Sequence, residues 1–189
     1  DWGYFPDPAV CLWIAVLPNT RAIVFKERSW QRILAVDVAK EIKRDSEGMH
    51  IIDSFCDPTM FIKTGADPFS IAEQFEHNGV PVTACQNDRE LFGYAIHQYL
   101  NTLIDLGPQV QMVEYACPQL IKTLPTLQMD KNDPRKIAPG NDHWAVALAY
   151  FCMGHAMPSR DPITPTIPRW MQPKRKHRNQ SSRLKLRSQ

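Results

Sequence analysis

Residues 9–29 read AVCLWIAVLPNTRAIVFKERS, and the first part of the topology follows from them. The run 9–17 is continuously apolar, with the composition of a buried strand. Residues 18–20, Pro-Asn-Thr, are typical of a tight turn. Apolar and polar side chains then alternate over 21–29, the period of a second strand. The stretch therefore predicts two strands joined in a hairpin.

Extended and helical patterns alternate downstream of the hairpin. Strands are predicted over 49–56, 80–85 and 110–115, and helices over 37–44, 69–77, 88–106, 117–127 and 143–153. The strand 49–56 should end at Asp57-Pro58, because proline cannot donate to a strand ladder. Two hairpin-linked strands followed by strand–helix units imply a mixed sheet with helices on both faces. This order predicts an α/β protein with a ribonuclease H-like, five-stranded mixed sheet.

Composition indicates one globular domain with an appendage. The chain has 189 residues, of which 43% are hydrophobic and 22% charged. No stretch of about 18 apolar residues and no signal peptide pattern occurs, so we expect no membrane partner and a cytoplasmic protein. The five cysteines form no CxxC pair, which argues against a zinc site or a disulfide framework.

The composition of the chain changes near residue 157. A proline-rich stretch without helical or strand period follows, and from Lys174 onward there are seven Lys or Arg and no acid. The first 173 residues therefore hold 15 basic and 20 acidic side chains. We predict a folded domain over 1–157 and a disordered, basic tail over 158–189. Such a tail is suited to neutralising phosphates.

Three acidic positions lie far apart in sequence, each where a predicted element begins or ends. They are Asp1, Asp57 and Asp142. Mg2+ and similar hard cations prefer carboxylate oxygens, and two such ions about 4 Å apart can hydrolyse a phosphodiester. Ligands of open α/β sheets bind beyond the carboxyl ends of strands. The layout suggests a metal-dependent nuclease.

Six motifs in a fixed order resemble the C-terminal nuclease domain of phage terminase large subunits, over residues 1 to about 154. They are Asp-Trp-Gly at 1–3, Asp-Pro-Ala at 7–9, Cys-Asp-Pro at 56–58, Asn-Asp-Arg-Glu-Leu-Phe-Gly at 87–93, Ala-Cys-Pro-Gln-Leu-Ile-Lys at 116–122 and Asn-Asp-His-Trp-Ala-Val-Ala-Leu-Ala-Tyr at 141–150. The resemblance implies a ribonuclease H-like endonuclease that cuts concatemeric double-stranded DNA during genome packaging, using two Mg2+ or Mn2+ ions.

The resemblance also implies partners and a location. The portal protein and the small terminase subunit would join the DNA as partners, at the procapsid portal in the bacterial host. A packaging ATPase domain normally lies upstream in the same chain. A chain starting at Asp1 is accordingly expected to be a piece of a longer polypeptide, with its first strand truncated.

By the same resemblance, Asp1, Asp57 and Asp142 are the catalytic metal ligands, and His143 is a possible additional ligand. One departure concerns Val146, because relatives often carry a second Asp shortly after that histidine. Without this second Asp, metal binding could be weak, or Asp142 must serve as the metal ligand in its place.

Several alternatives stay open. Asp53 rivals Asp57 on the same strand, Asp7 fits a structural turn, and Asp142 is also a suitable helix N-cap. The function could instead be that of another ribonuclease H-like nuclease, of the Holliday-junction resolvase or transposase type. A third possibility is a non-catalytic module that binds DNA or the portal and whose metal site has decayed.

Overall fold

The computed structural model describes residues 1–155 except 66, 106, 134, 135 and 139. The chain divides into a compact unit, Asp1–Met157, and a second segment, Pro158–Gln189. The predicted proline-rich and basic tail lies outside the described residues. All of the following concerns the first unit.

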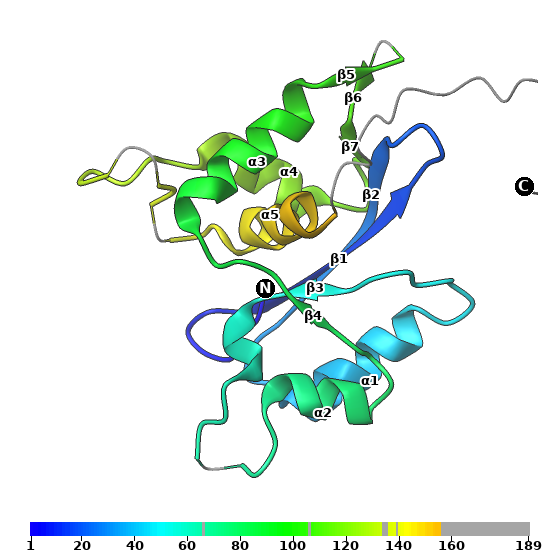
Figure 1. Cartoon of the computed structure of the whole chain (residues 1–189), viewed down its shortest axis with the longest axis vertical. Helices are drawn as coiled ribbons and strands as arrows, with labels where there is room; N and C mark the ends of the chain where they lie inside the picture. The colour runs from blue at the N-terminus through cyan, green and yellow to red at the C-terminus, as the bar shows by residue number, and fades with distance from the viewer. Residues whose placement is uncertain (66, 106, 134–135, 139, 156–189) are drawn as a thin grey trace, which may run out of the picture. The chain divides into compact units, whose positions relative to one another are not determined.

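Helices and strands alternate along this unit (Figure 1). The strands are β1 Ala9–Val16, β2 Ala22–Trp30, β3 Phe55–Cys56, β4 Thr83–Ala84, β5 Leu103–Ile104, β6 Gly107–Pro108 and β7 Val110–Met112. The α-helices are α1 Ala35–Asp45, α2 Ile71–His77, α3 Arg89–Asn101, α4 Pro118–Thr123 and α5 His143–Gly154. Two 3₁₀ turns, η1 Pro58–Phe61 and η2 Leu124–Thr126, complete the set.

The predicted hairpin forms the main sheet. β1 and β2 pair antiparallel, and β7 adds to β2 in parallel, which gives the order β1-β2-β7. The register shifts after Trp13, opposite Lys26, so that Phe25 of β2 has no partner on β1. Such a β-bulge bends its strand and increases the local twist.

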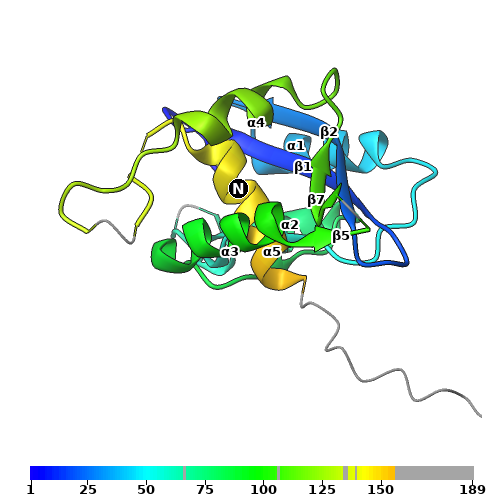
Figure 2. The same ribbon diagram turned by 90° about the horizontal axis from the view of Figure 1, so that it is seen from above.

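Helices cover both faces of this sheet, and each face has its own apolar core (Figure 1). Successive side chains of a strand point to opposite faces, so neighbouring residues of β1 belong to different cores. Trp13 packs in the core of α1 and α2, whereas Leu12 and Ile14 pack against the core of α3, α4 and α5. Helix α5 is apolar nearly all round and is buried, which is expected of a helix enclosed by other elements. Figure 2 shows α5 crossing between α3 and the sheet.

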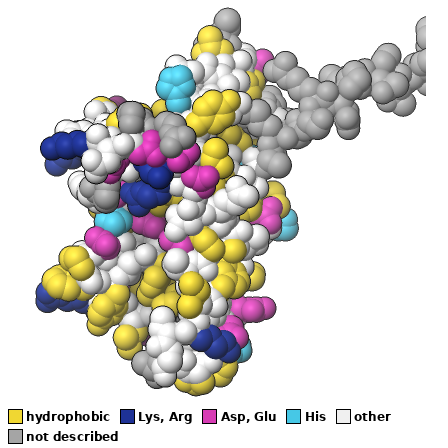
Figure 3. Space-filling model, turned by 60° about the vertical axis from the view of Figure 1, so that its left-hand side comes forward, with side chains coloured by type: hydrophobic (Ala, Val, Ile, Leu, Met, Phe, Trp, Pro, Cys, Tyr) yellow, Lys and Arg dark blue, Asp and Glu magenta, His cyan; other side chains and the backbone are white. Residues whose placement is uncertain are grey.

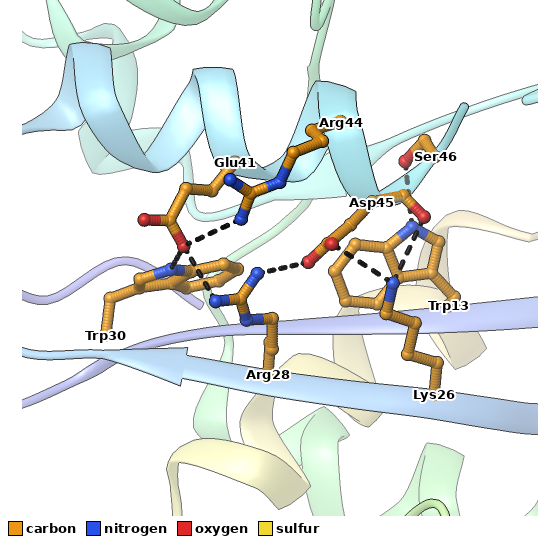
Figure 4. A network of polar contacts seen from close by, with 8 residues as sticks. All are labelled: Trp13, Lys26, Arg28, Trp30, Glu41, Arg44, Asp45 and Ser46. Atoms are coloured by element: carbon orange, nitrogen blue, oxygen red, sulfur yellow. Dashed lines mark hydrogen bonds and ion pairs between the residues drawn. The ribbon is translucent and has the colours of Figure 1, made fainter.

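Helix α1 is held to β2 by a polar network (Figure 4). The guanidinium of Arg28 binds Glu41 at 2.8 Å and Asp45 at 2.5 Å. The indole nitrogens of the two tryptophans also donate into it, from Trp30 to Glu41 at 2.7 Å and from Trp13 to Ser46 at 2.8 Å. We call these residues, with Lys26 and Arg44, the β2–α1 network.

The predicted continuous five-stranded sheet is not found among the described residues. The strands instead form three separate sheets, with β3-β4 parallel and β5-β6 antiparallel beside the main one. Only Phe55–Cys56 and Thr83–Ala84 of the predicted strands 49–56 and 80–85 find partners. A strand needs a neighbour in space, and sequence periodicity does not reveal how many residues find one.

The helix predicted over 88–106 ends at Asn101. Residues 103–108 form the β5-β6 hairpin instead, and Asp105 takes a positive φ of 51° there. The helix predicted over 117–127 becomes α4 followed by η2, because Pro125 supplies no amide hydrogen to continue the ladder. No helix among the described residues is both long enough and apolar enough to cross a bilayer.

Candidate functional site

Asp1 lies beside β1 and against the start of α5. Its backbone exchanges two hydrogen bonds with Val10, at 2.8 and 3.0 Å, as one strand residue does with another. Its carboxylate Oδ2 lies 3.0 Å from Nδ1 of His143, and the opposite ring nitrogen, Nε2, lies 3.4 Å from Oδ1 of Asp7. The side chains of Asp1 and His143 are only 10% and 15% exposed, so their contact is largely shielded from water, whereas the side chain of Asp7 is 67% exposed.

Asp57 follows β3 directly, as the sequence predicts. Its Oδ1 accepts a hydrogen bond of 2.7 Å from the amide of Thr59, which caps η1. Burial lowers the pKa of the Asp1 ammonium, and the nearby charge of Asp57 is among the effects that oppose this shift. The carboxylate of Asp57 therefore lies within electrostatic reach of Asp1.

Tyr150 on α5 connects Asp57 to the rest of the site. The tyrosine is 1% exposed and meets the ring of Phe92 edge to face at 5.4 Å. Burial raises the pKa of its phenol, and the charge of Asp57 and a hydrogen bond to it raise that pKa further. Arg89 acts in the opposite direction on the same phenol. The phenol of Tyr150 is thus influenced by both the carboxylate of Asp57 and the guanidinium of Arg89.

Asp142 precedes α5 in the N-cap position, but its side chain makes no capping hydrogen bond. Its Oδ2 instead accepts a short hydrogen bond from Nη2 of Arg89, the first residue of α3. Asp142 is 5% exposed. An isolated carboxylate at such a depth is strongly unfavourable, and Arg89 compensates for its charge. The capping role considered as an alternative is therefore not the one that this side chain plays.

Together these contacts place Asp1, Asp7 and Asp142 at the start of α5, beside His143, and Asp57 farther along the same helix, at Tyr150. Figure 3 shows acidic, basic and histidine side chains gathered on one face of the molecule. Carboxylate oxygens and an imidazole form a donor set that suits Mg2+ or Mn2+. Within the described residues, however, no three such side chains converge on one cation position. One of these acids, Asp142, is engaged by Arg89.

Other candidates are separated from this site by their surroundings. Asp53 is exposed and belongs to no strand. Val146 is 5% exposed and packs in the core of α3, α4 and α5, so an acid there would be surrounded by apolar side chains. Burial raises the pKa of the Cys11 and Cys56 thiols to about 12.

Sequence reasoning missed three residues of the site, namely Asp7, Arg89 and Tyr150. Asp7 had been assigned to a turn, although it approaches His143. Arg89 and Tyr150 both belong to motifs that carried the family resemblance. Their place in these motifs was the signal that could have identified Arg89 and Tyr150. A motif does not show, however, which buried acid a basic side chain will contact.

Comparison with known proteins agrees with the fold. No family model matches the sequence, and no curated protein matches it. Among solved structures, the nuclease domain of the large terminase of bacteriophage SPP1, crystallised with bound Mn, is similar over 82% of each chain, with 14% identity and a TM-score of 0.60. The predicted likeness is thereby confirmed at the level of the fold. This chain has the fold of a phage large-terminase nuclease domain.

Proposed function

We propose that this chain is a divalent-metal-dependent DNA endonuclease domain of the terminase large-subunit type. Asp1, Asp57 and Asp142 would be its catalytic metal ligands, and His143 an additional one. The observation that carries the proposal is the meeting of acids from separate segments at the start of α5, within a fold shared with a Mn-bound nuclease domain.

The charge of the site supports a cation. Asp1, Asp7, Asp57 and Asp142 contribute four carboxylates, against which lies the guanidinium of Arg89. Asp1 and Asp142 are the shielded members of this set, and excess negative charge on them lowers the free energy of a bound divalent ion. Two such ions, when bound, would activate the attacking water and stabilise the leaving 3′ oxygen.

The protein residues have separate tasks in this proposal. The backbone pairing with Val10 fixes Asp1 beside β1, and the ring of His143 orients its carboxylate. The amide of Thr59 and the phenol of Tyr150 orient Asp57. Positioning of this kind keeps ligands within the narrow geometry that metal chemistry requires.

The biological setting is part of the proposal. The substrate would be concatemeric double-stranded DNA, cut during genome packaging at the procapsid portal in the cytoplasm of the bacterial host. The portal protein, the small terminase subunit and a packaging ATPase domain in the same polypeptide would be the protein partners. The family resemblance stated above supports this setting.

A plasmid-nicking assay with Mn2+ tests the proposal. Wild type should convert supercoiled plasmid to nicked and linear forms, and Asp57→Ala should not, because it lacks an oxygen ligand. Preference for branched over linear duplex would favour the resolvase-like alternative instead.

A second candidate, a DNA- or portal-binding module without catalysis, rests on one observation. Asp142 is already neutralised by Arg89, so the cation site could be a vestige. Absence of nicking by both wild type and Asp57→Ala, with DNA binding retained, would support this candidate.

A further inference from the structure

Arg89 is the residue of the site to which the proposed function assigns no task. It opens α3 within the motif Asn-Asp-Arg-Glu-Leu-Phe-Gly of residues 87–93. The preceding Asp88 caps the helix, since its Oδ1 accepts a hydrogen bond of 2.9 Å from the amide of Glu90. The cap fixes where the helix begins, and Arg89 is thereby directed across to α5 at Asp142.

The hydrogen bonds of Arg89 are incomplete. Nη2 donates to Asp142, but Nε is buried and has no hydrogen-bond partner. The side chain as a whole is 36% exposed, so part of the guanidinium reaches solvent. A guanidinium presents five N–H donors in a planar fork, which matches the oxygens of a carboxylate or a phosphate. Arg89 is therefore bound to an acid on one side while it retains donors for another anion.

Arg89 would also compete with a cation for Asp142. Asp142 can give Oδ2 to a metal ion only if that oxygen no longer accepts from Nη2 of Arg89. A guanidinium released there would remain beside the bound substrate, because α3 and α5 are packed together through Phe92 and Tyr150. Arginine is more weakly hydrated than lysine and binds phosphate with two parallel hydrogen bonds, so exchange between two anions costs it little.

We propose that Arg89 is a catalytic residue that exchanges partners: without divalent ions its guanidinium neutralises Asp142, and with ions bound it binds a non-bridging oxygen of the phosphate to be cleaved. This inference rests on the proposed function. During the reaction a water oxygen forms a bond to phosphorus, the bond from phosphorus to the 3′ oxygen breaks, and the proton that the water loses ends on the 3′ oxygen. Negative charge gathers on the non-bridging oxygens, and Arg89 stabilises it without transferring a proton.

Two measurements on Arg89→Ala test the exchange. Mn2+ titration in the absence of DNA, followed by electron paramagnetic resonance, should give an affinity about tenfold higher than that of wild type, because the ion no longer displaces a guanidinium. Single-turnover cleavage of a linear duplex at saturating Mn2+ should nevertheless be about 100-fold slower, because transition-state charge has lost a donor.

Two further variants separate charge from geometry and protect the test against misfolding. Arg89→Lys keeps the charge but loses the fork, so Mn2+ affinity should match wild type while cleavage slows about tenfold. Arg89→Gln can still donate to Asp142 and replaces Arg89→Ala if that variant does not fold. Arg44→Ala, at an exposed position of α1, is the matched control and should change neither reading.

The outcomes are distinguishable. Cleavage by Arg89→Ala or Arg89→Gln at the wild-type rate would overturn the role of Arg89 alone. Weaker Mn2+ binding by these variants, in step with a lower melting temperature, would mean that Arg89 only supports Asp142 structurally and would likewise overturn the exchange. A folded wild type that binds Mn2+ without cleaving would overturn the proposed function, and with it the catalytic role of Arg89.

Discussion

The β2–α1 network and the acidic site at the start of α5 are built from the same side-chain types, but their charges are balanced differently. In the network, Lys26, Arg28 and Arg44 surround the carboxylates of Glu41 and Asp45 (Figure 4). In the site, Arg89 binds Asp142, whereas Asp1 and Asp7 contact the imidazole of His143. The network is saturated by its own residues, whereas the site has an excess of negative charge.

The two regions therefore differ in what they can do. A charge-balanced cluster on a folded surface stabilises the contact of its elements, and additional ions gain little there. An acid-rich cluster shielded by a helix start costs free energy until a cation binds, a pattern common at functional sites. Removing an acid should accordingly damage activity at the site and stability at the network.

The largest expected effect is on cleavage. Asp57→Asn and Asp142→Asn should each slow Mn2+-dependent cleavage on the order of 1,000-fold, because an amide replaces a charged ligand. The rate of plasmid nicking under single-turnover conditions checks this. Asp53→Asn is the matched control, since Asp53 precedes the same strand but is exposed, and it should cleave at the wild-type rate.

A smaller effect is expected on folding. Arg28→Ala should lower the free energy of unfolding by about 1–2 kcal/mol, because Asp45 and Glu41 lose charged donors while partial exposure of Arg28 screens the loss. Urea denaturation followed by tryptophan fluorescence measures it. Cleavage should be unchanged, and a rate reduced more than the folded fraction would break the contrast between the two regions.

The network should also make stability depend on pH. Burial raises the pKa of Asp45, but hydrogen bonds and charges of Arg28 and Lys26 outweigh it and leave that pKa below its ordinary value. A carboxyl with a lowered folded-state pKa stabilises the fold above its unfolded-state pKa, and this contribution is lost as pH falls through the folded-state pKa. Asp45→Asn should thus be less stable than wild type at neutral pH and approach it in acid. A difference that is constant with pH would contradict this assignment.

The smallest effect is expected at Ser46. Ser46→Ala removes the acceptor for the indole of Trp13, so the free energy of unfolding should fall by about 1 kcal/mol. Thermal unfolding of the two proteins side by side measures this, with cleavage again unchanged. No change in melting temperature would show that water replaces the hydroxyl.

Local patterns in the sequence predicted the fold where the interactions are local. The β1–β2 hairpin depends on an apolar run, a turn and an alternating run that are contiguous. The lengths of β3 and β4 are set by how many residues of two distant segments pair with each other. The sequence does not show this number, and the predicted strands were too long. The β5-β6 hairpin was missed because the apolar period of α3 continues past Asn101.

The residues of the site likewise fall into those that the sequence predicted and those that it did not. Asp1, Asp57 and Asp142 were predicted from motif order, and their role as ligands stays a prediction. Their neighbours were not predictable, because Arg89 meets Asp142 across 53 positions and His143 meets Asp1 across 142. Linear order contains no information on which basic side chain neutralises a buried acid.

The most direct test is a crystal structure of this chain soaked with Mn2+, analysed by anomalous diffraction. The account predicts Mn2+ peaks bounded by the carboxylates of Asp1, Asp57 and Asp142, with Arg89 no longer bonded to Asp142. A fully occupied crystal form with no peak there, or with Mn2+ held only by residues elsewhere, would contradict it.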